Sequence, residues 1–144
     1  SYQLLFTSRL YEFLYHLCRS YSHQIPSASL TGSQRDLQRV THVMNWVKVH
    51  YPEPLSLETA ADSLALSKEY FCRLFKKYTG QTFLEYLNDV RTMHLYEDLQ
   101  NSDETITVLM EKNGLSNYKI FMRTFKKLYG STPQKMRSNR IRHI

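Results

Sequence analysis

The sequence is short of the residues and patterns on which several classes of protein depend. Its 144 residues include four glycines and two cysteines, and no apolar run reaches 18 residues. Because a membrane-spanning helix needs a run of about that length, no span is predicted. Glycine-rich phosphate loops and a G-x-S-x-G nucleophile motif are also absent. Cys18 and Cys72 form no C-x-x-C motif, and we expect free thiols in a reducing cytoplasm.

Metal-binding and catalytic spacings are missing as well. The six histidines are scattered and include no H-E-x-x-H or other ligand spacing. We therefore expect no catalytic residue, no metal site and no cofactor, and the chain is predicted not to be an enzyme. No signal-peptide pattern opens the sequence, and its start at Ser1 rather than methionine indicates a fragment.

Acidic residues are absent from the C-terminal part of the chain. Residues 112–144 hold nine Lys/Arg and no Asp/Glu, whereas residues 83–111 hold one Arg and seven acids. A second basic focus consists of Lys68, Arg73, Lys76 and Lys77. This distribution of a net charge of +6 favours nucleic acid or another anionic surface as the partner. A solvated basic face or tail is the alternative that charge alone leaves open.

Apolar residues recur at helical spacing, and no segment alternates long enough to predict a strand. The sequence therefore predicts an all-α fold. We expect helices at 3–21, 36–50, 57–64, 68–79, 83–100, 104–112 and 118–129, and a last short helix from Thr132-Pro133. The expected N-caps are Ser56, Ser67, Thr82, Asp103 and Asn117, and Gly80 and Gly130 are expected to end the two basic helices.

Twelve residues occur twice in the chain, fifty positions apart. Phe71–Thr82 and Phe121–Thr132 share the pattern F-x-R-x-F-K-K-x-x-G-x-T, with seven identities. A repeat of this kind indicates one structural unit made twice. In each copy a short helix, a tight turn and a longer basic helix give the outline of a helix-turn-helix.

The expected organisation follows from these helices. It comprises an amphipathic helix at 1–22, a linker at 23–35, a first helix-turn-helix subdomain at 36–81, a long linker helix at 82–101, a second helix-turn-helix subdomain at 102–137 and a frayed basic tail at 138–144.

The basic helices are predicted to be apolar on one face and cationic on the other. Phe71, Leu74, Phe75 and Tyr78 share a face in the first helix, as Phe121, Phe125 and Leu128 do in the second, and core packing is their expected role. The opposite faces carry Glu69, Cys72, Arg73 and Lys76, and Lys119, Met122, Arg123 and Lys126.

Those opposite faces have the chemistry that a DNA groove requires. An α-helix fits the major groove, where arginine binds guanine O6 and N7, so Arg73 and Arg123 are the first candidates for base reading. Phosphate contacts are predicted for Lys68, Lys76, Lys77, Tyr118, Lys126 and Lys127. Because Glu69 and Cys72 are replaced by Lys119 and Met122 in the second copy, the two helices are expected to read unlike half-sites.

The ordered set of motif residues resembles the DNA-binding domain of the AraC/XylS family over about residues 36–137. It consists of Ser67, Phe71, Arg73, Phe75, Lys76, Gly80, Thr82, Tyr86, Leu87 and Arg91, then Gly114, Phe121, Arg123, Phe125, Lys126, Gly130, Thr132, Pro133 and Arg137. The resemblance implies two helix-turn-helix subdomains joined by a long helix and inserted into adjacent major-groove segments. It implies bacterial transcription regulation, most often activation, with double-stranded DNA and RNA polymerase as partners. By position it assigns base contacts to Glu69, Cys72, Arg73, Lys119, Met122 and Arg123.

The same resemblance bears on the N-terminal helix and on effector binding. Family members usually carry a sensing or dimerising domain before the DNA-binding part, and the helix at 3–21 resembles its last helix. The effector would then bind a domain absent from this chain. The apolar stripe of residues 3–21 is expected to form a homodimer contact or to pack back on residues 36–51.

A few positions depart from the family pattern. A tyrosine, Tyr96, replaces a small residue in the linker helix, Asn113 replaces an apolar residue, and Leu109, Met110 and Leu115 replace other residue types. These changes predict altered packing in the second subdomain. A function from another class also stays open, namely a protein-interaction module whose basic helices bind an acidic partner or an anionic membrane surface.

Overall fold

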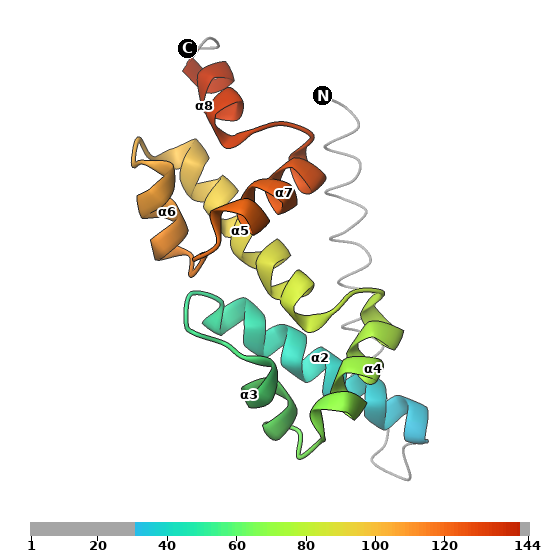
Figure 1. Ribbon diagram of the computed structural model, residues 1–144. Coiled ribbons are helices and arrows are strands. Elements are labelled where there is room, and N and C mark those ends of the chain that lie inside the picture. The colour runs from blue at the N-terminus through green and yellow to red at the C-terminus, as the bar shows by residue number, and fades with distance from the viewer. Residues whose placement is uncertain (1–30, 142–144) are drawn as a thin grey trace. The chain divides into compact units, whose positions relative to one another are not determined.

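The computed structural model describes residues 31–141, and these form seven helices and no strand. The predicted all-α fold is confirmed for this part of the chain (Figure 1). The chain divides into two compact units, Ser1–Ser33 and Gln34–Ile144, and the second contains nearly all of the described residues. The amphipathic helix predicted at 3–21 lies outside them, as does most of the predicted linker.

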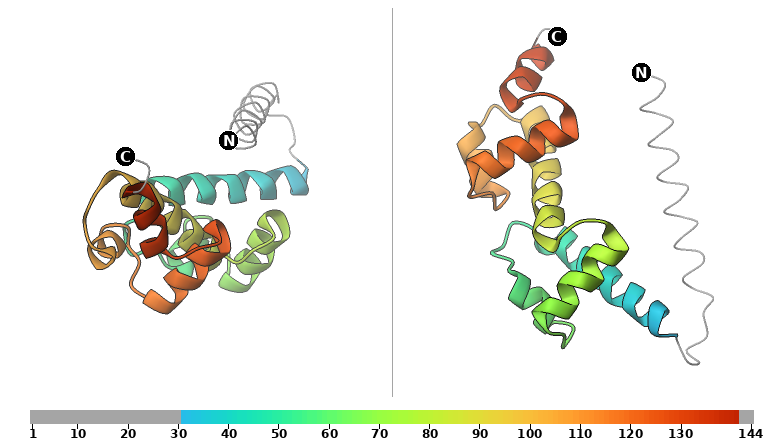
Figure 2. Two further views of the ribbon diagram at one scale, coloured as in Figure 1. Left: turned by 90° about the horizontal axis from the view of Figure 1, so that it is seen from above. Right: turned by 45° about the vertical axis from the view of Figure 1, so that its right-hand side comes forward.

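The helices follow one another along the chain with short connections. They are α2 (Gly32–His50), α3 (Leu57–Asp62), α4 (Lys68–Thr79), α5 (Phe83–Asn101), α6 (Ile106–Lys112), α7 (Tyr118–Tyr129) and α8 (Pro133–Ile141). We call α2, α3 and α4 the first subdomain and α6, α7 and α8 the second subdomain. The linker helix α5 runs from one subdomain to the other (Figures 1 and 2).

The outermost helix ends differ from the sequence prediction. α2 begins at Gly32, so the last residues of the linker predicted at 23–35 are helical. These residues carry no apolar signal, but a helix that is already nucleated extends through them at little cost. At the other end α8 continues to Ile141, so it includes the first residues of the tail for which fraying is predicted. The middle of α8 is anchored through Arg137, whose Nη2 donates a hydrogen bond to the Glu104 carbonyl at 2.6 Å.

The start of α6 also differs from the prediction. The helix begins at Ile106 rather than at Glu104, because Thr105 and not Asp103 is its N-cap. The Thr105 hydroxyl accepts a hydrogen bond from the Val108 amide at 3.3 Å. Several polar residues before an apolar run are all capable caps, and the sequence alone does not choose between them.

A first hydrophobic core holds the first subdomain against the N-terminal half of α5. Its buried residues are Val40, Val43, Val47, Ala60, Ala61, Phe71, Leu74, Phe75, Phe83, Tyr86, Leu87 and Val90. The Phe75 and Phe83 rings meet edge to face with centroids 5.8 Å apart. Burying a phenylalanine contributes about 1.5–3 kcal/mol, so these rings anchor α4 to the linker helix.

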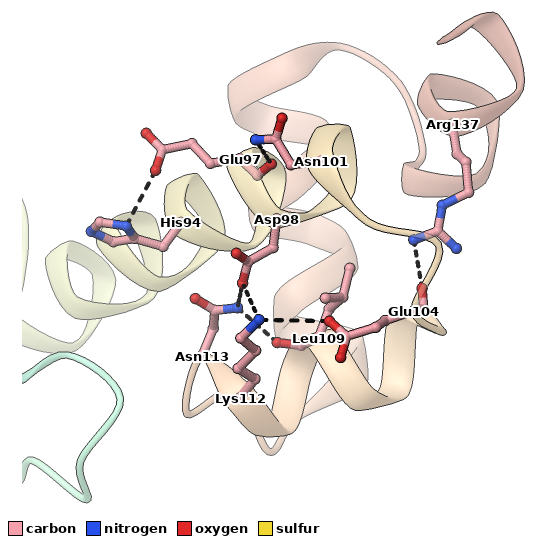
Figure 3. A network of polar contacts seen from close by, with 9 residues as sticks. All are labelled: His94, Glu97, Asp98, Asn101, Glu104, Leu109, Lys112, Asn113 and Arg137. Carbon is pink, nitrogen blue, oxygen red and sulfur yellow. Dashed lines mark hydrogen bonds and ion pairs between the residues drawn. The ribbon is translucent and has the colours of Figure 1, made fainter. Parts of the chain in front are cut away.

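A second core joins the second subdomain to the C-terminal half of α5. Its buried residues are Leu95, Leu99, Leu109, Met110, Leu115, Phe121 and Phe125. Tyr96, which departs from the family pattern, stacks on Tyr129 with ring centroids 4.1 Å apart. Asn113, another departure, is 1% exposed. Its Nδ2 donates to the Leu109 carbonyl at 2.9 Å and to Asp98 Oδ2 at 2.8 Å (Figure 3).

The linker helix changes its covered side halfway along its length. Phe83, Leu87 and Val90 face the first core, whereas Leu95 and Leu99 face the second. At 3.6 residues per turn these two sets lie on roughly opposite sides of the helix. A helix with one covered side would bury Met93 together with Val90, whereas Met93 is 51% exposed at the point where the covered side changes.

Candidate nucleic-acid interface

The two basic helices, α4 and α7, begin and end in the same way. Ser67 and Asn117 are their N-caps, and each side chain accepts a hydrogen bond from the backbone amide three residues later. Gly80 and Gly130 end the helices in the left-handed conformation. These caps agree with the sequence prediction, because capping depends on residues close in the chain.

One face of each basic helix is packed into a core. Phe71 and Phe75 in α4, and Phe121 and Phe125 in α7, are all 0% exposed. The predicted packing role of these phenylalanines is confirmed. Since both faces opposite them are exposed to solvent, each basic helix presents its cationic side outward. Seen from above, α4 and α7 both lie on the side away from α2 (Figure 2).

Five of the six residues predicted to read bases are exposed, namely Glu69, Cys72, Arg73, Lys119 and Arg123. Arg73 and Arg123 make no ion pair with any residue in the described part of the chain, so their guanidinium groups are available to a ligand. Met122 differs, because it is partly buried and packs against the second core. Its exposed counterpart Cys72 is a free thiol.

The six residues predicted to contact phosphate are all exposed, but they differ in their partners. Lys68 Nζ is 2.9 Å from Glu58 Oε1, and both side chains are about half exposed. Lys127 Nζ lies 2.9 Å from Oδ2 of Asp89, whose side chain is only 16% exposed. Lys77 lies over the Tyr78 ring at 5.4 Å. Lys76, Lys126 and Tyr118 complete the set.

A carboxylate at the start of α5 lies in the field of both basic helices. Glu85 Oε2 accepts hydrogen bonds from the Thr82 amide at 2.8 Å and from its hydroxyl at 2.9 Å, which completes the predicted capping box. These bonds hold the pKa of Glu85 below its usual value, and the charges of Lys127 and Lys76 lower it further. Lysines of α7 and α4 therefore both act on this one carboxylate.

Two arginines of the family motif, Arg91 and Arg137, connect distant parts of the fold. Arg91 Nε donates to the Tyr51 carbonyl at 2.7 Å, and its Nη2 donates to the Glu53 carbonyl at 2.6 Å. Arg137 donates one hydrogen bond, from Nη2, to the Glu104 carbonyl in the loop before α6. Sequence reasoning gave neither a role, because their partners lie more than thirty residues away along the chain.

The loop after α2 also reaches the C-terminal half of α5 and the turn before α7. The Tyr51 and His94 rings stack with centroids 4.0 Å apart. Burial, followed by the charges of Asp98 and Glu97, raises the pKa of Tyr51. An open groove of about 580 Å³ lies between this loop and the turn at Gly114, and Arg91 lines it. No group of three His, Cys, Asp or Glu residues with metal-binding geometry occurs within residues 31–141.

A helix-turn-helix domain model matches residues 60–139, which is more than half of the chain. This chain belongs to the AraC-type helix-turn-helix family of DNA-binding transcription regulators. The predicted family is thereby confirmed. Among the described residues of this AraC-type domain, no helix has the length and apolar character that a bilayer crossing requires.

Curated relatives agree with this assignment. The chain is 31% identical to the HTH-type transcriptional activator RhaS of Escherichia fergusonii over 111 residues, which cover 77% of this chain and 40% of RhaS. It is 33% identical over 102 residues to an HTH-type transcriptional regulator of Staphylococcus aureus. The match covers 71% of this chain but only 14% of that relative, so the AraC-type domain spans a small part of the longer protein.

Solved structures show the same fold. The DNA-binding domain of AdpA, solved in complex with a target DNA, superposes with a TM-score of 0.63 at 25% identity, covering 70% of this chain and 91% of that chain. The C-terminal domain of the response regulator AraT from Geobacillus stearothermophilus gives a TM-score of 0.62 at 26% identity. That match covers 70% of this chain and 84% of AraT's.

Proposed function

We propose that this AraC-type domain binds one asymmetric DNA element by placing α4 and α7 in adjacent major-groove segments. The observation that carries the proposal is the pairing of Arg73 and Arg123. Both lie exposed at the same position of the repeat, opposite fully buried phenylalanines, on helices with matching caps. Because arginine binds guanine through two hydrogen bonds, each is suited to read one base.

The lysines of the same helices supply the sequence-independent part of binding. Lys76 and Lys126 occupy equivalent positions beside the two arginines and are exposed. Phosphate contacts of this kind give affinity and register, whereas base contacts give specificity. We therefore assign Lys68, Lys76, Lys77, Tyr118, Lys126 and Lys127 to phosphate.

Residues that differ between the two helices support an asymmetric site. Glu69 in α4 is replaced by Lys119 in α7, which changes the charge at an early position of the helix. Cys72 is exposed, whereas its counterpart Met122 is partly buried. We propose that the two half-sites have different sequences and that Met122 contributes less to base reading than Cys72 does.

We further propose that the domain acts within a bacterial activator in the cytoplasm. The activator named RhaS supports this, and activation would require a contact with RNA polymerase. We also propose that an effector binds a domain outside this chain and that residues 3–21 form a homodimer contact. The competing function, binding to an anionic membrane surface, would need several aromatic rings exposed beside the lysines. The four phenylalanines of the two basic helices are buried, and only Tyr70 and Tyr118 are exposed.

A binding-site selection followed by titration of the selected and scrambled duplexes tests the function. We expect tight, salt-sensitive binding to the selected duplex. Arg73→Ala and Arg123→Ala should each cost about 1–3 kcal/mol of binding and relax specificity, at two different positions of the site. Lys48→Ala is the control, because Lys48 is exposed but lies on α2. Equal affinity for selected and scrambled duplexes at every salt concentration would overturn the proposal.

A further inference from the structure

The linker helix carries two carboxylates that interact with lysines of the basic helices. Glu85 and Asp89 are four residues apart in α5 and so lie on the same face, one turn from each other. Lys127 of α7 donates to both oxygens of Asp89, at 3.0 Å and 2.9 Å. Lys76 of α4 and Lys127 both act electrostatically on Glu85.

The two carboxylates differ in what else holds them. Glu85 is occupied by the amide and hydroxyl of Thr82 in the capping box, so its main role is to start α5. Asp89 has Lys127 as its partner, and its side chain is 16% exposed against 57% for the lysine. A partly buried carboxylate that holds both oxygens against one ammonium forms a stronger pair than exposed ions do.

The pair between Lys68 and Glu58 gives a useful contrast. Its side chains are 51% and 57% exposed, and its Nζ–Oε1 distance is 2.9 Å. Exposed pairs of this kind contribute little, because water and salt screen them. Of the two lysines that carry an ion pair on the basic helices, Lys127 is thus the one held more firmly away from an external anion.

We propose that Asp89 sets the affinity of the domain for DNA by competing with phosphate for Lys127. The inference rests on the proposed DNA-binding function. To reach a phosphate, Lys127 must leave Asp89, and the carboxylate then stays unpaired close to the polyanion. The phosphate contact is therefore offset by the ion pair that is lost. Asp89 is a positioning residue that acts through Lys127 and touches no base.

Asp89→Asn tests this directly, because it keeps the shape of the side chain and removes its charge. We expect the variant to bind selected and scrambled duplexes alike more tightly, about fivefold near 0.15 M salt, the gain from one further phosphate contact. The slope of log K against log salt should become steeper by about one unit. Both are measured by fluorescence anisotropy titrations at several salt concentrations.

Lys127→Gln supplies the second arm. In the wild-type background it should weaken binding to both duplexes only modestly, because the phosphate contact that it removes is offset by the ion pair that Lys127 gives up to make it. In the Asp89→Asn background it should remove the whole gain and return the salt slope to its wild-type value. Glu97→Gln is the matched control, since it makes the same charge change on α5 about 12 Å further along the helix. We expect it to alter neither slope nor affinity by more than a small part of the Asp89→Asn effect.

The outcomes separate this proposal from its alternatives. If the ion pair merely orients α7, Asp89→Asn will weaken binding to the selected duplex and leave the scrambled duplex unchanged, which would overturn the proposal. Unchanged affinity on both duplexes would overturn it as well. Failure of the proposed function shows itself differently, as a wild-type protein that does not distinguish the two duplexes. Urea unfolding of each variant confirms that the compared proteins are folded.

Discussion

The two helix-turn-helix subdomains have one plan but different connections to the rest of the molecule. In both, a helix with three buried residues at spacings of three and four covers the short and the basic helix. These residues are Val40, Val43 and Val47 in α2, and Thr92, Leu95 and Leu99 in α5. The connection that follows is longer in the first subdomain, at residues 51–56 against residues 102–105. The longer connection contacts the linker helix and the turn at Gly114, whereas the shorter one is bound through Glu104 to Arg137 of α8 and Lys112 of α6.

This difference shows how the two basic helices are held relative to one another. If α5 were the only connection, the two subdomains would be joined by a single helix. The loop that contains Pro52 adds a second link, through Arg91, the stack of Tyr51 on His94, and the turn at Gly114. We infer that the spacing of the two half-sites on DNA depends on this loop as much as on the linker helix.

The turns before the basic helices also differ between the two subdomains. Each contains one residue in the left-handed region, Ala65 with φ of 54° and Gly114 with φ of 74°. A Cβ atom at Gly114 would lie 2.7 Å from the Pro52 carbonyl oxygen and 3.1 Å from Arg91 Nε. The second turn therefore needs glycine for space as well as for conformation, while the first accepts alanine.

The largest effect is expected for Gly114→Ala. It combines a strained left-handed alanine with a clash against backbone, and should lower the free energy of unfolding by roughly 3 kcal/mol. Urea unfolding measures the loss. Gly130→Ala is the control, because Gly130 has φ of +69° and no atom within 4 Å of its added Cβ. Its expected cost is about 1 kcal/mol. Equal costs for both variants would show that the contact with Pro52 is unimportant.

Arg91→Met should have the next largest effect and lower the free energy of unfolding by about 2 kcal/mol, because the partly buried guanidinium donates two hydrogen bonds to the loop after α2. The variant should also tolerate an inserted base pair between the half-sites better than the wild type does, since the second link is lost. Titrations with duplexes of altered spacing measure this. Arg137→Met, whose bond stays within the second subdomain, should lower stability without changing spacing tolerance. The same tolerance in both variants would contradict the inferred role of the loop.

Alkaline pH should destabilise the second subdomain through deprotonation of Tyr129. The equivalent residue in the first copy of the repeat is Thr79. Burial raises the pKa of Tyr129 to about 12, above an ordinary value of 10.0. The folded protein keeps this proton where the unfolded chain releases it, so stability is complete below pH 10 and falls as the pH rises toward 12. Tyr129→Phe should reduce the loss between pH 9 and 11 by up to roughly 1 kcal/mol, because the ring is only half buried. Urea unfolding at the two pH values measures it, and an unchanged loss would contradict the assignment to Tyr129.

The smallest effect is expected for Ala65→Gly, and it has the opposite sign. Glycine relieves the left-handed strain but adds entropy to the unfolded chain, so the net gain should be about 0.5 kcal/mol. Differential scanning calorimetry should show a slightly higher Tm. A lower Tm would mean that the Ala65 methyl group contributes packing that outweighs its strain.

Much of the candidate interface was predictable from residues close together in the chain. The caps Ser67, Asn117 and Gly80 and the buried phenylalanines all follow from spacing within one helix. The middle of α5 was not predictable in this way. Thr92 is 0% exposed and Met93 is 51% exposed, because the helix meets a different core on each side. Periodicity assumes one covered face, and two partners on opposite sides defeat it.

The sequence by itself determined the order of the described helices, most of their caps, the two faces of α4 and α7, and the family, because each depends on short-range spacing or on an ordered motif. Only the tertiary structure decided what Arg91 and Gly114 contact, and that Lys127 is paired with Asp89. The hydrogen-bonded and ion-paired partners among them lie 38 or more residues apart in the chain. Contacts at that separation form only when packed cores bring their helices together, and no local pattern records them.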